Sequence, residues 1–200
     1  MPAGDIKILE KVMDSITETT DNFIVLSTHD DVDVLVKKEY KDKVIDVLDG
    51  YGFRGHINGN PECLYYAEPH IQFFDSAKCH IDIQTGLYYN GFRPNTLIPI
   101  DIQFQNYVFD KRVKTDDIWR YRLSPESNVV HTVCRIVFDK RKTPPHYKDR
   151  LIRCMKDCDS DELLRAFDMA LFKFGKKAHE LVMNAEYDNI ATEYIRYTDY

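Results

Sequence analysis

The chain has 200 residues, 44% of them hydrophobic, so it is long enough for one substantial core and short for two independent ones. Its 33 acidic and 27 basic side chains give a net charge of −6, which argues against a protein that grips duplex nucleic acid by neutralising many phosphates. No run approaches the roughly 20 consecutive apolar residues of a membrane span, and the beginning lacks a signal-peptide core. We therefore expect a cytoplasmic protein that does not bind membranes.

The first fifty residues alternate between helical and strand patterns. Apolar residues recur at the helical period in two segments, whereas FIVLS and DVDVLV are short runs typical of strands. Gly50 and Gly52 end the second helical pattern. In chain order we predict a helix over 5–20, strands at 23–27 and 31–36 joined by a turn at Thr28–Asp30, and a helix over 38–48.

Short runs of aromatic and β-branched residues follow, separated by turn residues. They predict consecutive antiparallel strands at 62–67, 70–74 and 79–83. The segment 86–101 has no clear period, and we expect it to be a long functional or packing loop.

After Ser124 the pattern is helical. Ser124 followed by Pro125 is a typical helix start, and Pro144-Pro145 ends that helix. Further helices are predicted at about 146–156, 161–174 and 176–196. The sequence thus predicts an α/β (α+β) fold in which a mixed β-sheet with flanking helices, residues 1–120, is followed by a helical region, residues 121–200.

Two aspartates stand one strand-step apart in the second strand. Side chains alternate between the faces of a strand, so Asp31 and Asp33 point one way while the valines between and after them face the core. The same alternation in CHIDI, residues 79–83, places Asp82 on a polar face. We therefore predict that the three carboxylates converge on one cation.

Carboxylate oxygens suit Mg²⁺ or Mn²⁺ and not zinc. Two such ions bridged by carboxylates stabilise the attacking and the leaving oxygen of a phosphoryl displacement. The alternative is that these are ordinary solvated carboxylates on a surface strand, since two aspartates with one residue between them also occur by chance in acidic proteins.

FIVLS, DVDVLV, the helix that ends LDGYGF, and HIDI together resemble the nucleotidyltransferases of the DNA polymerase beta superfamily, over about residues 5–105. HTVCRIVFDKRK, residues 131–142, resembles the helical extensions of small bacterial nucleotidyltransferase-like proteins. The resemblance implies that Asp31 and Asp33 bind both metals and the nucleotide phosphates. It also implies that Asp82 completes the metal site and helps to activate the acceptor hydroxyl.

The chain departs from the family at the phosphate site. Family members carry a Gly-Ser or Gly-Gly pair that opens a helix whose backbone N–H groups hold the triphosphate. Here Ser27 and Thr28 lead directly into DVD, and the intervening helix has gone. We take Ser27, Thr28 and Arg135 as candidate nucleotide-binding residues. For Arg135 and the basic cluster 140–142, the alternative is a charged helix end that complements the helix dipole.

Two histidines and an aromatic cluster are weaker candidates. His29 and His80 share the carboxylate faces and either contact acceptor or phosphate or are merely solvated. The cluster Tyr88-Tyr89 with Phe92-Arg93 either stacks on a base or sugar or anchors its loop to the core.

The leading hypothesis is a metal-dependent enzyme that moves a nucleoside monophosphate from an NTP to a small-molecule or protein acceptor. The acidic net charge disfavours nucleic-acid acceptors. Two alternatives stay open: a glycosyltransferase whose DVD motif holds Mn²⁺ and a nucleotide sugar, and a catalytically silent binding module with the same fold.

Overall fold

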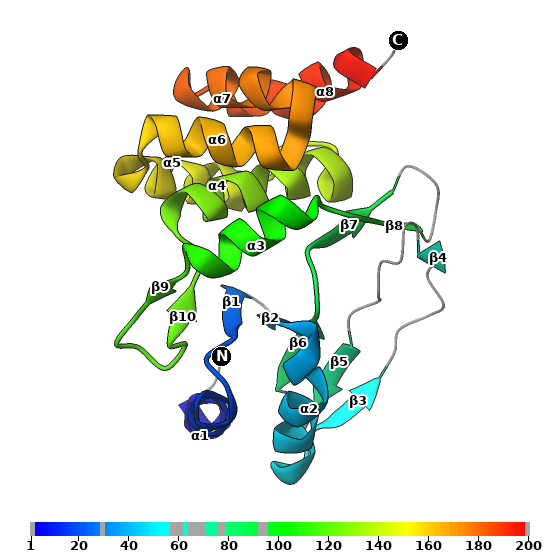
Figure 1. Ribbon diagram of the computed structural model, residues 1–200, viewed down its shortest axis with the longest axis vertical. Helices are drawn as coiled ribbons and strands as arrows, with labels where there is room; N and C mark the ends of the chain where they lie inside the picture. Colours follow the sequence, from blue (N-terminus) through cyan, green and yellow to red (C-terminus); the bar gives the residue numbers. More distant parts are fainter. Residues whose placement is uncertain are drawn as a thin grey trace.

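The structure is a computed structural model that describes residues 3–28, 31–56, 62–63, 71–75, 79–91 and 96–198 (Figure 1). It is an α/β protein in which a mixed sheet with flanking helices is followed by a helical C-terminal region, as the sequence predicts. No helix in the described part of the chain is long and apolar enough to cross a membrane.

The first helices and strands lie where their periodicity predicts them. They are α1 (Ala3–Thr19), β1 (Phe23–Ser27), β2 (Val32–Val36), a 3-10 turn η1 (Lys38–Tyr40) and α2 (Lys41–Gly50). The predicted helix over 38–48 thus begins as a 3-10 turn. Gly52 has φ +83°, a left-handed conformation that ends α2 without the strain that a side chain would cause.

The main sheet has seven strands in the order β3-β5-β6-β2-β1-β10-β9. The remaining members are β3 (Arg54–His56), β5 (Ile71–Phe74), β6 (His80–Gln84), β9 (Val113–Lys114) and β10 (Tyr121–Arg122). At the centre, β2 is antiparallel to β1 and parallel to β6. The sheet therefore places two strands that are far apart in the sequence side by side.

Alternate residues of the central strands belong to two different cores. On one face, Val32, Val34 and Val36 pack with α1 and α2. On the other, Leu35 packs with the C-terminal helices. Figure 1 shows α1 and α2 below the sheet and the helices α3 to α8 above it. Asp33 shares its face with Leu35, so it points toward the helical region.

The helical elements that follow β8 (Thr96–Pro99) form a helical region, and their buried apolar residues share one core with Ile24, Leu26 and Leu35 of the sheet. The members of this region are α3 (Ile102–Asp110), α4 (Pro125–Cys134), a π-helical turn η2 (Arg135–Lys140), α5 (Pro145–Cys154), η3 (Met155–Asp157), α6 (Ser160–Leu171), η4 (Phe172–Phe174), α7 (Gly175–Met183), η5 (Tyr187–Asn189) and α8 (Ile190–Thr198). The predicted helix starts are confirmed, because the Ser124 hydroxyl accepts from the Ser127 N–H and the Asp159 carboxylate accepts from the Glu162 N–H.

The prediction of a loop over 86–101 is wrong. This segment contains β7 (Tyr88–Asn90) and β8 (Thr96–Pro99), which pair antiparallel, and β4 (Glu62–Cys63) pairs parallel to β8. Strands of three or four residues are too short to show a period of two. The long-range contact of Tyr89 with His131 fixes this small sheet instead.

The prediction of a single helix over 176–196 is also wrong. α7 ends at Met183 and α8 begins at Ile190, because Ala185 takes a left-handed backbone (φ 55°) between them.

The sequence did not predict α3, β9 or β10. Residues 64–67 and 70 of the expected strands lie outside the described residues. The division at residue 120 stays a prediction, although α3 packs on α6 and β10 pairs with β1 across that line.

Candidate functional site

Asp31, Asp33 and Asp82 form a cluster that we call the acidic corner, which lies where β2 and β6 run in parallel. Asp33 and Asp82 are directly opposite each other in the register of these two strands, so both side chains lie on the face that points toward the helical region. Asp82 is only 6% exposed, and Asp33 is half-buried. Asp31 lies immediately before β2. The alternation of side chains in DVDVLV and HIDI sets the face on which these aspartates lie, and the parallel pairing of β2 with β6 places Asp33 and Asp82 side by side.

His80 lies between two of these carboxylates. Its Nε2 is 2.5 Å from Oδ1 of Asp82, and its Nδ1 is 3.7 Å from Oδ2 of Asp31. The ring stacks on Phe74 with centroids 4.3 Å apart and an interplanar angle of 19°. One potential ligand atom from each of Asp31, His80 and Asp82 lies within 4.8 Å of the others. This donor set fits a divalent cation.

The carboxyl group of Asp33 has a raised pKa. Burial, followed by the negative charge of Asp31, raises its pKa from 3.8 to about 6. Asp82 acts in the same direction, while Arg135 and His80 work to lower the pKa. Carboxylates that raise one another's pKa are stabilised in their charged form by a bound cation.

The raised pKa of Asp33 predicts a stability change. The folded protein binds this proton more tightly than the unfolded chain does, so the contribution of Asp33 to the free energy of unfolding falls as pH rises from about 4 to about 6. In chelator at pH 7, Asp33→Asn is expected to raise the free energy of unfolding by about 1–3 kcal/mol. Denaturant unfolding at pH 7 and at about pH 4 measures this; an equal difference at both pH values would contradict it.

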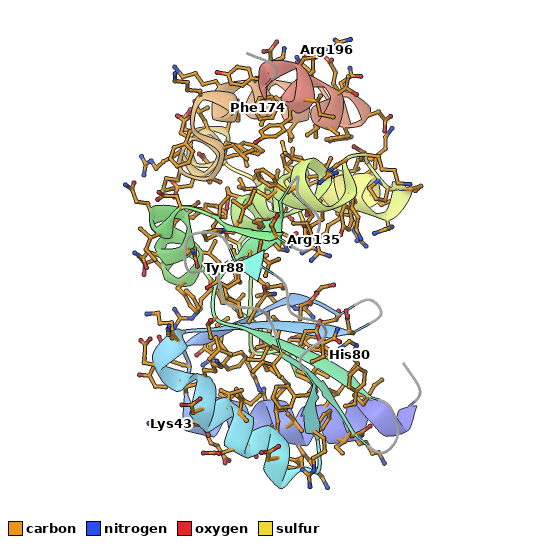
Figure 2. The ribbon with its side chains drawn as sticks, turned by 90° about the vertical axis from the view of Figure 1, so that its right-hand side faces the viewer. Lys43, His80, Tyr88, Arg135, Phe174 and Arg196 are labelled. Carbon is orange, nitrogen blue, oxygen red and sulfur yellow. The ribbon has the colours of Figure 1, made fainter. Side chains whose placement is uncertain are left out.

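A cleft of about 660 Å³ separates the acidic corner from the helical region. Ser27, Thr28, Asp31 and Asp33 lie on its sheet side. Its other side, which the helical region provides, carries a set of basic residues that we call the basic wall: Arg135, Lys140, Arg150 and Arg153. Arg122 also lines the cleft, but it belongs to β10 of the sheet. Figure 2 shows His80 among the strands and Arg135 at the edge of the helical region that is turned toward them.

Two arginines of the basic wall are held in different ways. Arg135 Nε is 3.0 Å from Oδ2 of Asp139 and donates a hydrogen bond to the Tyr147 hydroxyl. Burial works to lower the pKa of Arg135, but the nearby Asp139, Tyr147 and Asp33 overcome this and raise it. Arg135 is therefore a cation that already has a paired carboxylate.

Arg150 is held by neutral groups. Its Nη2 donates to the backbone carbonyl of Leu26 at 2.8 Å, and its Nε donates to Oδ1 of Asn128 at 2.5 Å. Burial lowers the pKa of Arg150, which shows that the charged form is incompletely compensated. An anion in the cleft would supply the missing negative charge.

No protein-family model matches the sequence, and no curated protein matches it. Among solved structures, the solution structure of the antibiotic-resistance factor ANT(2'')-Ia is similar, with a TM-score of 0.47 and 12% sequence identity over 100% of both chains. A likeness of this size carries no argument about function, which has to come from the residues of the cleft.

The structure places five of the six predicted site residues around the cleft, namely Ser27, Thr28, Asp31, Asp33 and Arg135. Asp82 lies beside Asp31, within the ligand cluster. Lys140 also lines the cleft, whereas Arg141 turns away and donates to the carbonyl of Gly91.

Tyr89 anchors its segment to the core, because it is buried and its hydroxyl is 2.7 Å from Nδ1 of His131. For Tyr89, this is the second of the two alternatives given for the aromatic cluster, an anchor to the core. His29 and the pair Phe92-Arg93 lie outside the described residues.

The sequence interpretation missed Arg150 and Arg153, which form part of the basic wall. A signal was present, because His146, Arg150 and Arg153 follow one another at spacings of four and three and so lie on one face of α5. The sequence does not reveal that this face is turned toward the aspartates, since that depends on how α5 packs.

Proposed function

We propose that the protein is a metal-dependent nucleotidyltransferase that moves a nucleoside monophosphate from an NTP to a hydroxyl on a small-molecule or protein acceptor. The observation that carries the proposal is one cleft with aspartates on its sheet side and the basic wall opposite. A metal–triphosphate complex has both charges, so it matches both sides. The cleft volume of about 660 Å³ falls within the range of small-ligand sites.

The sheet side would hold the cation. Asp31, Asp33 and Asp82 supply oxygen ligands, which Mg²⁺ and Mn²⁺ accept. Such ions polarise a phosphoryl group and neutralise charge that develops during its transfer. The raised pKa of Asp33 is compatible with this assignment, since burial and then the charge of Asp31 disfavour its charged form, which a bound cation would stabilise.

The helical side would hold the phosphates. Arg150 and Arg135 present guanidinium groups suited to phosphate oxygens, and the hydroxyls of Ser27 and Thr28 lie at the end of β1 in the same cleft. In our proposal these side chains take over the task that backbone N–H groups of a Gly-Ser turn perform in the family that the sequence resembles. Arg150 is well placed for it, because it is already fixed to Leu26 at the end of β1.

The reaction would be a displacement at the α-phosphorus. The acceptor oxygen forms a bond to phosphorus, the bond between the α-phosphorus and its bridging oxygen breaks, and pyrophosphate leaves. The proton of the acceptor hydroxyl passes to a carboxylate oxygen of Asp82. Asp82 is suited to this because it is buried beside Asp31 and directly opposite Asp33, next to the proposed cation.

Thermal melts test nucleotide and metal binding together. We expect millimolar MgCl₂ to raise the melting temperature of the wild type and an NTP with MgCl₂ to raise it further, because each binds the folded state. Asp33→Asn should lose the MgCl₂ shift, and the matched control Asp161→Asn, on the exposed start of α6, should keep it.

A screen for pyrophosphate release over candidate acceptors would then establish turnover. If the protein binds a nucleotide sugar with Mn²⁺ but no NTP with Mg²⁺, the glycosyltransferase hypothesis replaces this proposal. If it binds neither the NTP nor the nucleotide sugar, the hypothesis of a catalytically silent binding module replaces it.

A further inference from the structure

The cation site contains a nitrogen donor as well as carboxylates. His80 is the first residue of β6, and strand alternation places it on the same face as Asp82. Its two ring nitrogens face two different carboxylates, Nε2 toward Asp82 and Nδ1 toward Asp31. An imidazole in this position is part of the acidic corner and not of the surrounding surface.

The ring is also fixed in place. The phenyl ring of Phe74 stacks on it, and β5, which carries Phe74, pairs with β6 so that Phe74 and His80 are register partners. The His80 side chain is 20% exposed, so most of it is already removed from water. A ligand held by stacking and burial loses little conformational entropy when it binds a metal.

We propose that His80 is a metal ligand through a ring nitrogen, so that this site prefers first-row transition ions such as Mn²⁺ and Co²⁺ over Mg²⁺. The proposal rests on the cation site of the proposed function and deepens it. Its basis is the cluster in which ligand atoms of Asp31, His80 and Asp82 lie within 4.8 Å of one another. Mg²⁺ takes oxygen ligands and binds imidazole poorly, whereas transition ions accept both donor types.

The direct test uses the pulsed electron paramagnetic resonance of Mn²⁺ bound to the full chain. Nitrogen coupling to Mn²⁺ is expected in the wild type, and it should be lost in His80→Phe, which keeps an aromatic ring on Phe74 but offers no donor atom. The matched control is His179→Phe, since His179 lies on α7 and contacts Ser160 away from the cleft. This control should keep the coupling.

Calorimetric titration with MnCl₂ and MgCl₂ gives a second readout. In the wild type the dissociation constant for Mn²⁺ should be lower than that for Mg²⁺ by about tenfold or more, and His80→Phe should bring the ratio close to one. If circular dichroism shows that His80→Phe does not fold, His80→Gln replaces it in both experiments.

The outcomes separate this inference from the function on which it rests. Mn²⁺ that binds without nitrogen coupling in the wild type, or with coupling that persists in the His80 variant, overturns the role of His80 and leaves the cation site standing. Absence of binding by both MnCl₂ and MgCl₂ overturns the cation site and the role of His80 together.

Discussion

Asp33→Asn is expected to abolish metal-dependent NTP binding and to lower turnover by on the order of 10²–10³-fold or more. The loss of one negative ligand weakens the cation that neutralises the triphosphate, so binding and turnover fall together. The protein itself should remain folded, because Asn at this half-buried position carries no charge and so removes both the cost of burying a carboxylate and its repulsion with Asp31, the two largest causes of the raised pKa of Asp33. Calorimetric titration with an NTP and MgCl₂, together with pyrophosphate release, measures both losses.

Asp82→Asn is the informative partner of this variant. It should lower turnover strongly while changing the dissociation constant for the NTP much less, because assistance to the acceptor hydroxyl matters mainly in the transition state. Asp161→Asn, on the exposed start of α6, serves as the control and should behave as the wild type. Equal losses of NTP affinity in Asp33→Asn and Asp82→Asn would contradict the division of roles between these two carboxylates.

Arg150→Gln is expected to raise the dissociation constant for the NTP by about 10- to 100-fold, since a hydrogen bond between charged groups contributes about 1.5–3 kcal/mol. Binding of the metal alone should change much less, because Arg150 donates to the Leu26 carbonyl and to Asn128 and supplies no ligand atom to the cation. Arg150→Lys keeps the charge without the planar fork and should give a smaller loss. Titrations with an NTP and with MgCl₂ alone measure the two effects separately.

A control is needed because Arg150 also binds Leu26 and Asn128 in the folded protein. Arg196→Gln removes an exposed arginine of α8 that pairs with Glu193, and it should leave NTP affinity at the wild-type value. Thermal melts of each variant establish that it is folded. A folded Arg150→Gln variant with unchanged NTP affinity would remove Arg150 from the phosphate site.

The acidic half of the cleft was predictable from the sequence, because it depends on local alternation. DVDVLV and HIDI each separate polar from apolar positions, and burial of the valines on one side forces the aspartates to the other. The pairing of β2 with β6 was not visible in either segment alone. It brings Asp33 opposite Asp82 although 48 intervening residues separate them in the chain.

The basic half could not be placed from the sequence. A stripe of basic residues on α5 indicates a charged helix face but says nothing about what it faces. The contact of Arg150 with the end of β1 depends on how the helical core packs on the sheet. The short strands β7 and β8 were not predicted for a related reason. They are stabilised by tertiary contacts such as that between Tyr89 and His131.

In our proposal one cleft holds a cation on its aspartates and nucleotide phosphates on its basic wall. A crystal structure of the complex with Mg²⁺ and a non-hydrolysable NTP tests it most directly. We expect metal density at the carboxylates of Asp31 and Asp33, with phosphate oxygens in contact with Arg135 and Arg150. A nucleotide bound outside the cleft, or phosphates bound with no ion on these aspartates, would contradict it.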